Sequence, residues 1–325
     1  MNARVTFRSS IRSRFLKSAG ILSSVAVAAG LLGAVGAGSA DAAPVCPGAG
    51  QPVRLVGSVP GAALEGLTVD TRGRLYTTDI LSGRVFRLDA PGAAPVPIAT
   101  VPGGGGALAW ASPTTLLVGF GANPSVIVGD VVRQAGIVRL DINTLASRVW
   151  VRGLSAANGM DVARNGTVYA TNDFGTLIGR AFPNGAVQPD WASFPSANGA
   201  VLGRDDGFLY VSRTFVNPGV SRISTSNPRV VQSLLSTGPE ATPDGLTLDS
   251  RDRPVVPFNA TGEIVRINAP GSSCLLGRTP GLASVLTYGQ GDRGFSSGRL
   301  FRAGFDGRIY EVPGGFDPAA RTATP

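Results

Sequence analysis

The chain has 325 residues, a formal net charge of +8 and no histidine. Without histidine, Ser-His-Asp triads, His-bound zinc and imidazole general bases are excluded, so any catalysis must use carboxylates, amides, hydroxyls, the backbone or a hard metal ion. Five basic residues fall within the first 17 positions, and the others are dispersed without interleaved aromatic residues, which argues against nucleic-acid binding.

The first 42 residues are organised like a secretory signal peptide. A basic leader ends at Lys17, an uncharged apolar stretch runs from Ala19 to Gly38, and residues 40–42 offer a small-x-small cleavage site. An uncleaved anchor is the alternative, because the apolar stretch is long enough to span a bilayer. We expect cleavage and bacterial export, which leaves residues 43–325 as one secreted domain with no stable membrane anchor.

Cys46 and Cys274 are the only cysteines. Both lie in the part of the chain that would be exported, and an even pair in an oxidising compartment predicts a single disulfide. Two unrelated thiols are the alternative.

A repeat begins at residues 64–89, which read LEGLTVDTRGRLYTTDILSGRVFRLD. Apolar and polar residues alternate around Leu67 and Val69 and again after the glycine turn that ends at Arg74. This pattern predicts three short strands joined by tight turns.

Three later stretches repeat this plan. Asn158, Asn198 and Asp244 each precede a glycine, an alternating strand, a polar turn and a second strand, as Glu65 does in the first copy. The gap before Asn158 is about twice the later gaps, which indicates that it holds another copy.

Two more copies complete the series. One spans residues 103–141, with a longer insertion around residues 123–134, and a divergent one spans residues 282–312. Six units of several strands each predict an all-β, six-bladed β-propeller. Its blades would start near residues 64, 103, 156, 196, 242 and 281. A pair of β-sandwiches is the alternative, but it leaves the regular spacing unexplained.

The strand VRLVGSV, residues 53–59, precedes the first unit. We predict that it completes the sixth blade after Tyr310 and closes the ring, which hides the edge strands. A disulfide between the two cysteines would then tie this strand to the connection between blades five and six. Short apolar runs would form outer fourth strands at residues 96–102, 147–154, 191–195 and 230–236.

Glu65, Asn158, Asn198 and Asp244 hold the same position in four blades, at the start of the strand that lines the central channel. We therefore expect them to converge at the axis. Two carboxylates and two amides form an oxygen-only set that suits one divalent cation, with Ca²⁺ favoured over Mg²⁺ or Mn²⁺. The alternative is structural, because Asn-Gly and Asp-Gly are common turn dipeptides and Glu65 alone could be a solvated acid.

On three motifs the chain resembles the senescence-marker/gluconolactonase/LRE (SMP-30-like) family of six-bladed propellers, which includes calcium-dependent lactonases. The motifs are LEGLTVDTRGRLYTTDILSGRVFRLD, ANGMDVARNGTVYATND and TPDGLTLDSRDRPVV. The resemblance implies that Glu65, Asn198 and Asp244 hold the cation, with Asn158 beside them. The two asparagines could exchange roles, because the sequence after Asn158 is the more typical blade-four form.

The resemblance also implies metal-dependent hydrolysis of a small lactone or related ester, with Asp244 as ligand and base. Ala156 occupies the position where sugar-lactone members of the family carry an arginine, so a sugar-acid lactone is disfavoured. Glu240 is a candidate pocket or second-shell acid, although a surface loop acid is the simpler interpretation.

Two other functions fit the same architecture. A non-catalytic secreted propeller could bind a ligand or a protein through its mouth, and a propeller enzyme of different chemistry, such as a lyase, would not use this metal site.

Overall fold

A computed structural model describes residues 43–320 of the chain. The predicted signal peptide, residues 1–42, lies outside the described residues. Within residues 43–320, no helix has the length and hydrophobicity needed to cross a bilayer.

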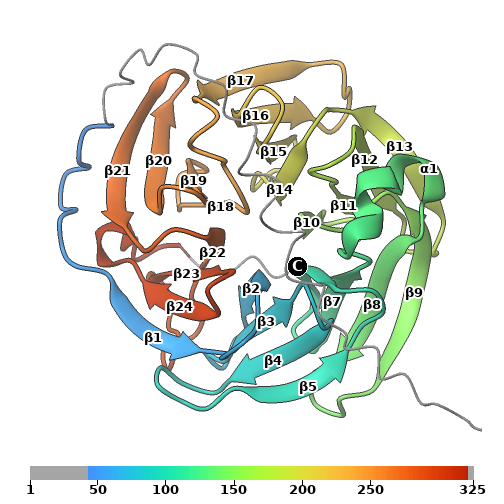
Figure 1. Ribbon diagram of the computed structural model, residues 1–325, viewed down its shortest axis with the longest axis horizontal. Coiled ribbons are helices and arrows are strands. Elements are labelled where there is room, and N and C mark those ends of the chain that lie inside the picture. Colours follow the sequence, from blue (N-terminus) through green and yellow to red (C-terminus); the bar gives the residue numbers. More distant parts are fainter. Residues whose placement is uncertain (1–42, 321–325) are drawn as a thin grey trace, which may run out of the picture. The chain divides into compact units, whose positions relative to one another are not determined.

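Six four-stranded antiparallel sheets surround a central axis as the blades of a β-propeller (Figure 1). The predicted all-β, six-bladed fold is therefore confirmed. Blades one to three comprise β2 (Leu64–Val69), β3 (Leu75–Asp79), β4 (Arg84–Leu88) and β5 (Val96–Thr100), then β6 (Gly105–Ser112), β7 (Thr115–Phe120), β8 (Ala135–Asp141) and β9 (Ser147–Leu154), then β10 (Met160–Val162), β11 (Val168–Ala170), β12 (Leu177–Ala181) and β13 (Val187–Ser193). Blades four to six comprise β14 (Ala197–Leu202), β15 (Phe208–Arg213), β16 (Gly219–Ser224) and β17 (Val231–Ser236), then β18 (Thr247–Leu248), β19 (Pro254–Pro257), β20 (Glu263–Ala269) and β21 (Ser272–Arg278), then β22 (Ala283–Tyr288), β23 (Leu300–Gly304), β24 (Arg308–Glu311) and β1 (Arg54–Ser58).

The sixth blade is closed by the N-terminal strand, as predicted. β1 pairs antiparallel with β24, with Leu55 opposite Tyr310. Three of the four predicted outer strands coincide with β5, β9 and β17, whereas the run at residues 191–195 is only the end of β13. The ring therefore leaves no unpaired strand between its first and last blades.

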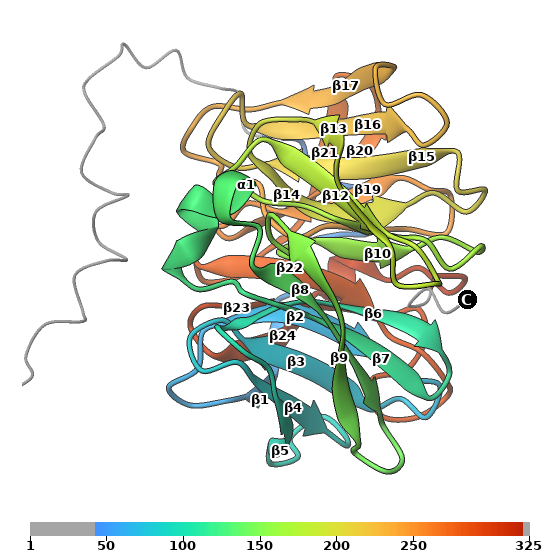
Figure 2. The same cartoon turned by 90° about the vertical axis from the view of Figure 1, so that its right-hand side faces the viewer.

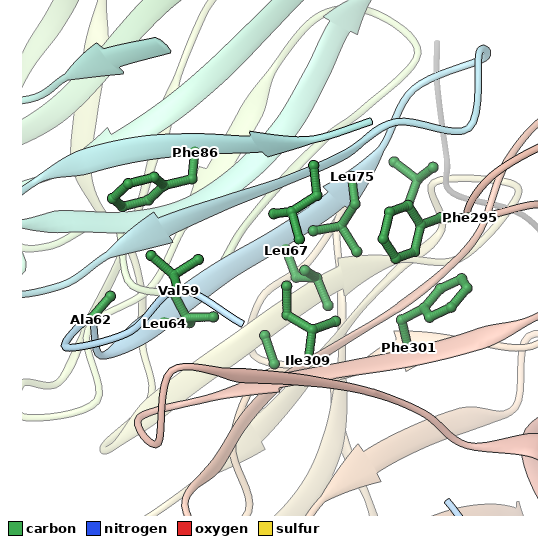
Figure 3. Packing of buried hydrophobic residues seen from close by; sticks show 12 residues of the cluster. Val59, Ala62, Leu64, Leu67, Leu75, Phe86, Phe295, Phe301 and Ile309 are labelled. Atoms are coloured by element: carbon green, nitrogen blue, oxygen red, sulfur yellow. The ribbon is translucent and has the colours of Figure 1, made fainter. Parts of the chain in front are cut away.

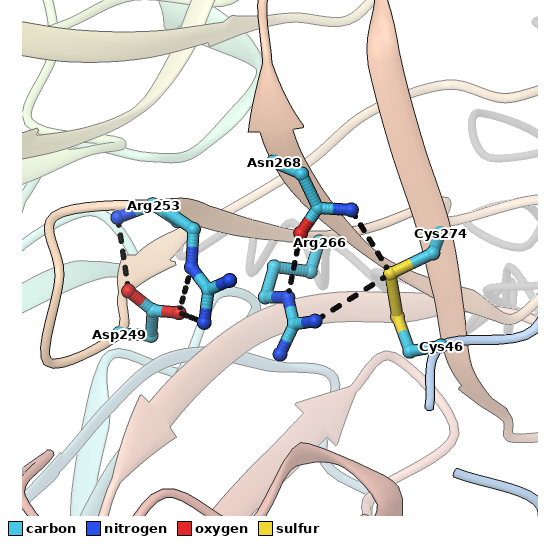
Figure 4. The surroundings of a disulfide bond; sticks show 6 residues. All are labelled: Cys46, Asp249, Arg253, Arg266, Asn268 and Cys274. Atoms are coloured by element: carbon cyan, nitrogen blue, oxygen red, sulfur yellow. Dashed lines mark hydrogen bonds and ion pairs between the residues drawn. A yellow bond between two sulfur atoms is a disulfide. The ribbon is translucent and has the colours of Figure 1, made fainter. Parts of the chain in front are cut away.

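The predicted disulfide between Cys46 and Cys274 is present (Figure 4), with the two Cα atoms 5.0 Å apart. Its place differs from the prediction, because Cys274 lies in β21, the outer strand of blade five, and not in the connection between blades. Val45 pairs in parallel with Leu275, so the segment before β1 runs along the outside of blade five. The bond thus fastens the chain just before it enters blade six.

Apolar side chains fill the spaces between neighbouring blades. Between blades six and one, Leu64, Leu75 and Ile309 are fully buried together with Phe301 and Phe295, whose rings meet edge to face at 5.1 Å (Figure 3). Each fully buried leucine or phenylalanine contributes about 2 kcal/mol relative to an exposed one. This packing makes the inner ends of the blades a rigid platform.

The insertion between β7 and β8 lies on one face of the ring (Figure 2). It contains the 3-10 helix η2 (Pro124–Val128) and the short helix α1 (Gly129–Val132). The side chain of Asn123 caps η2 by accepting from the backbone N–H of Ser125. The insertion connects a second to a third strand, so it lies at the end of the blades where the inner strands begin.

Candidate functional site

The four predicted residues meet at the axis. Glu65, Asn158 and Asn198 line one cavity of about 70 Å³, together with Gly245, the neighbour of Asp244. The charge of Asp244 raises the pKa of Glu65, and the amide of Asn198 lowers that of Asp244. Side chains from four blades are therefore within electrostatic reach of one another.

The glycine after each of these residues allows the inner strands to approach closely. A Cβ atom on Gly66 would lie 2.6 Å from the carbonyl oxygen of Gly106, and one on Gly159 would lie 2.1 Å from that of Asn198. Neither glycine has a positive φ, and the glycines after Glu65 and Asn198 lie within strands β2 and β14. The glycines bring the preceding polar side chains together around a narrow channel.

Hydroxyl groups on the second strands hold this arrangement. Thr78 Oγ1 accepts from the backbone N–H of Gly66 (2.8 Å) and donates to the carbonyl of Gly106 in the next blade (2.7 Å). Thr171 forms the same pair of bonds to Gly159 and to the carbonyl of Asn198. Each hydroxyl thus ties a polar residue's own blade to its neighbour.

Three further polar residues at the ends of the second strands contact the site. Asn158 Nδ2 donates to Asp173 Oδ1 (3.2 Å), and Asn198 Nδ2 donates to Thr214 Oγ1 (2.9 Å). Asn259 Nδ2 donates to Asp244 Oδ2 (3.0 Å).

Sequence analysis did not identify Asp173, Thr214 or Asn259 as site residues. Their common spacing could have revealed them, because Asp173 follows Asn158 by 15 residues, as Asn259 follows Asp244, and Thr214 follows Asn198 by 16.

The site contains buried oxygen atoms that lack hydrogen-bond donors. Glu65 Oε2, Asn158 Oδ1 and Asn198 Oδ1 are enclosed, and none of them accepts a hydrogen bond within the described part of the protein. An unpaired buried acceptor costs about 1–3 kcal/mol, and more when it is charged. Three such oxygens beside a second carboxylate fit a hard divalent cation, which accepts oxygen ligands of this kind.

The surroundings of the site disfavour the ionised form of its carboxylates. Burial, together with repulsion from Asp244 and Asp173, raises the pKa of Glu65 well above its ordinary value. Burial first, and repulsion from Asp173 second, raises the pKa of Asp244 to about 8, and burial raises that of Asp173 to about 7. The cluster therefore lacks a positive charge that would compensate its carboxylates.

Residues 43–320 contain no group of three or more His, Cys, Asp or Glu side chains placed to hold a metal ion. A centre at the axis would therefore depend on the amide oxygens of Asn158 and Asn198 as well as on carboxylates. Both asparagines donate through Nδ2, to Asp173 and to Thr214, and the Oδ1 atom of each is buried without a donor. The assignment of Asn198 as the ligand and of Asn158 as its neighbour stays a prediction.

The other two sequence candidates lie apart from this cluster. Glu240 is exposed, and its carboxylate lies against Gly238 of its own loop. Ala156 is buried and presents no polar group. The role of Glu240 as a pocket or second-shell acid stays a prediction.

No family model matches the chain, and no curated protein sequence matches it. Solved structures do resemble it. A gluconolactonase from Xanthomonas campestris superimposes with a TM-score of 0.65 at 18% identity, over 84% of this chain and 96% of that one. Regucalcin from Agrobacterium tumefaciens, a calcium-binding protein, gives 0.64 at 17% identity, over 84% and 96%. Virginiamycin B lyase from Staphylococcus aureus gives 0.53 at 16% identity, over 80% and 88%.

Proposed function

Starting from a propeller fold shared with gluconolactonases and regucalcin, we propose that this protein is a divalent-metal-dependent hydrolase of a lactone or related ester. Glu65, Asn198 and Asp244 would hold the ion at the axis, with Asn158 beside them. The observation that carries the proposal is the set of buried oxygens without donors at one point of the ring. Ca²⁺ is favoured over Mg²⁺ or Mn²⁺, because it tolerates irregular oxygen coordination that includes amides.

A bound divalent cation would polarise the carbonyl of the substrate and lower the pKa of a water molecule. The protein's part is to fix the groups around that point. Asp244 accepts from the N–H of Gly245 through Oδ1 (2.9 Å) and from Asn259 through Oδ2, so its carboxylate cannot rotate. We assign to Asp244 the roles of ligand and of base toward the attacking water. Asp173, buried beside Asn158, is the rival for the second role.

Lyase chemistry is the weaker candidate. A virginiamycin B lyase in which one histidine is replaced by alanine is catalytically inactive, and this chain has no histidine. The side chains of the present site therefore cannot supply that group.

We also propose that residues 1–42 are a signal peptide and that the protein acts outside the cell. The disulfide supports this, because such bonds persist in oxidising compartments and are rare in the cytosol.

The decisive test is calorimetric titration of EDTA-treated mature protein with Ca²⁺, Mg²⁺ and Mn²⁺. We expect one ion to bind, and binding to vanish in the Glu65→Gln, Asp244→Asn double variant. A screen of lactones and esters in the preferred metal then tests turnover. If the wild type binds none of the three ions, the hydrolase proposal is wrong. Binding without any turnover would favour the non-catalytic propeller.

A further inference from the structure

Two half-exposed phenylalanines stand at the mouth of the site. Phe174, in the β11–β12 connection of blade three, is 50% exposed, and Phe215, in the β15–β16 connection of blade four, is 46% exposed. Their rings are 5.0 Å apart with an interplanar angle of 34°. Together they form an aromatic surface that bridges two blades.

Each ring is one residue from a side chain that contacts the site. Phe174 follows Asp173, the acceptor for Asn158, and Phe215 follows Thr214, the acceptor for Asn198. Thr214 Oγ1 also donates to the carbonyl of Pro243, the residue before Asp244. The two aromatic residues are therefore the direct sequence neighbours of side chains that contact the proposed metal centre.

Hydrogen bonds fix the backbone at both rings. The N–H of Phe174 donates to Asn172 Oδ1 (3.0 Å), and that of Phe215 donates to Ser196 Oγ (2.8 Å). Asn172 and Ser196 are buried. The phenylalanines are thus held on rigid loops even though their rings face solvent.

The insertion extends the apolar surface beside blade three. Its backbone is fastened there, because Asn172 Nδ2 donates to the carbonyl of Val126 (3.0 Å). Several of its apolar side chains nevertheless face outward, and Val131 is 84% exposed. We define the apolar rim as Phe174 and Phe215 with the exposed residues Val216, Ile127, Val128 and Val131. These residues lie on connections at the same end of the blades, and exposed apolar residues that form a patch mark binding sites.

Polar groups in the same sector are already engaged. The carboxylate of Asp130 accepts from Ser155 Oγ (2.5 Å), from the backbone N–H of Thr176 (2.7 Å) and from its hydroxyl (2.9 Å). These bonds clamp the insertion to blade three. They also leave the Asp130 carboxylate unavailable to bind the hydroxyls of a sugar.

We propose that the substrate carries an alkyl or aryl group that lies against Phe174 and Phe215 while its lactone or ester carbonyl reaches the axial site. This inference rests on the proposed hydrolase function and specifies its substrate class. It places polyhydroxylated lactones among the poor substrates, because they would leave the rim uncovered and their own hydroxyls unpaired.

The first test compares δ-valerolactone, δ-decalactone and glucono-δ-lactone with Ca²⁺-loaded protein. We expect kcat/KM for δ-decalactone to exceed that for the unsubstituted ring by about tenfold or more, because each buried methylene adds binding. Phe174→Ala and Phe215→Ala should each remove most of this preference, so that the ratio of kcat/KM for δ-decalactone to kcat/KM for δ-valerolactone falls toward one.

Phe316→Ala is the matched control. Phe316 is 60% exposed and lies against Gly298, in the β22–β23 connection at the opposite end of the blades. This variant should leave kcat/KM unchanged for both lactones. Equal rates for the alkyl-substituted and unsubstituted rings, or equal losses on both in the rim variants, would overturn the proposal while leaving the hydrolase function intact.

The second test does not require turnover. Calorimetry would measure binding of two lactams, δ-valerolactam and its pentyl-substituted analogue. A preference for the pentyl compound that disappears in Phe174→Ala supports the rim even if no lactone is hydrolysed, in which case only the proposed function fails. No preference, combined with sedimentation of the protein with phosphatidylcholine vesicles or with self-association lost in Phe174→Ala, would assign the rim to a lipid surface or a second copy and refute the proposal.

Discussion

Blades one and five each bury an acidic side chain at both ends of their inner strand. The acids at the two ends differ in whether an arginine pairs with them. At the far end, Asp70 accepts from Arg74 Nε (2.7 Å), and Asp249 accepts from Arg253 Nε (2.6 Å; Figure 4). Backbone N–H groups of the same turns complete both carboxylates.

At the mouth, Glu65 and Asp244 are buried to the same degree, with 5% and 3% of their surface exposed. No arginine or lysine forms an ion pair with either within residues 43–320. Burial alone therefore does not distinguish a structural acid from a functional one. What distinguishes them is whether the fold supplies the compensating charge or leaves it to a ligand.

The largest expected effect is at the mouth. Asp244→Asn should lower kcat/KM about 1000-fold, equivalent to about 4 kcal/mol of transition-state stabilisation. At about pH 9, where Asp244 is ionised, the free energy of unfolding in EDTA should not fall, because the substitution removes an uncompensated buried charge. Hydrolysis rates and urea titrations measure the two effects. Full turnover by this variant would show that Asp244 is neither ligand nor base.

The same substitution at the far end should lower stability and leave metal binding unchanged. Asp249→Asn removes the partner of Arg253, so we expect a loss of about 2–4 kcal/mol in the free energy of unfolding. Calorimetry should find Ca²⁺ binding unchanged. Asp70→Asn and Glu65→Gln form the matched pair in blade one. Equal losses of stability at both ends would refute the distinction between structural acids at the far end and functional acids at the mouth.

The pH dependence of the metal-free protein sharpens the comparison. Asp173 and Asp244 have folded-state pKa values of about 7 and about 8, above the unfolded value of about 3.9. The folded state therefore binds more protons, so stability in EDTA is full below about pH 4 and falls as the pH rises toward about 8.

Each pKa unit corresponds to about 1.4 kcal/mol, so the two raised pKa values together set an upper limit of about 10 kcal/mol on this loss. Urea midpoints between pH 4 and pH 9 measure it. Excess Ca²⁺ should remove most of the decline, because it stabilises the ionised carboxylates, and Asp244→Asn should reduce the decline without added metal. A flat profile in EDTA would contradict the assignment of uncompensated charge to the mouth.

The smallest expected effect concerns the support of Asn198. Thr214→Val removes the acceptor for Asn198 Nδ2, so the amide loses its fixed orientation and Ca²⁺ affinity should weaken about three- to tenfold. Thr225→Val is the control, because Thr225 Oγ1 bonds the carbonyl of Asp206 at the far end of the same blade. Calorimetry of both variants would expose a general effect of losing a hydroxyl.

The sequence predicted those features that repeat. The phase shared by Glu65, Asn158, Asn198 and Asp244 placed them at one point, because a radial repeat carries equivalent positions to a common axis. The closing strand followed from the same repeat, whereas the disulfide partners followed from there being only two cysteines. The repeat therefore made it possible to predict the blades and the four polar residues at the axis.

Other features were harder to predict. Asp173, Thr214 and Asn259 keep a common spacing after the polar residues of the inner strands, but they differ in residue type, so no shared chemistry drew attention to that spacing. The bond at Cys274 was assigned to the wrong segment, because the length of the β20–β21 hairpin is not encoded in the blade spacing. The contact between Phe174 and Phe215 depends on the angle between two blades, which local patterns do not specify.

The pairing of β1 with β24 has a consequence for how the chain matures. The strand that emerges first from a ribosome or an export channel must wait for the strand that emerges almost last, and Cys46 is 228 residues from its partner. Closing so long a loop is entropically slow, and five blades can assemble before the sixth is complete. Until then the ring has two open strand edges, so the stage before β1 pairs with β24 is the one in which unpaired edges are exposed.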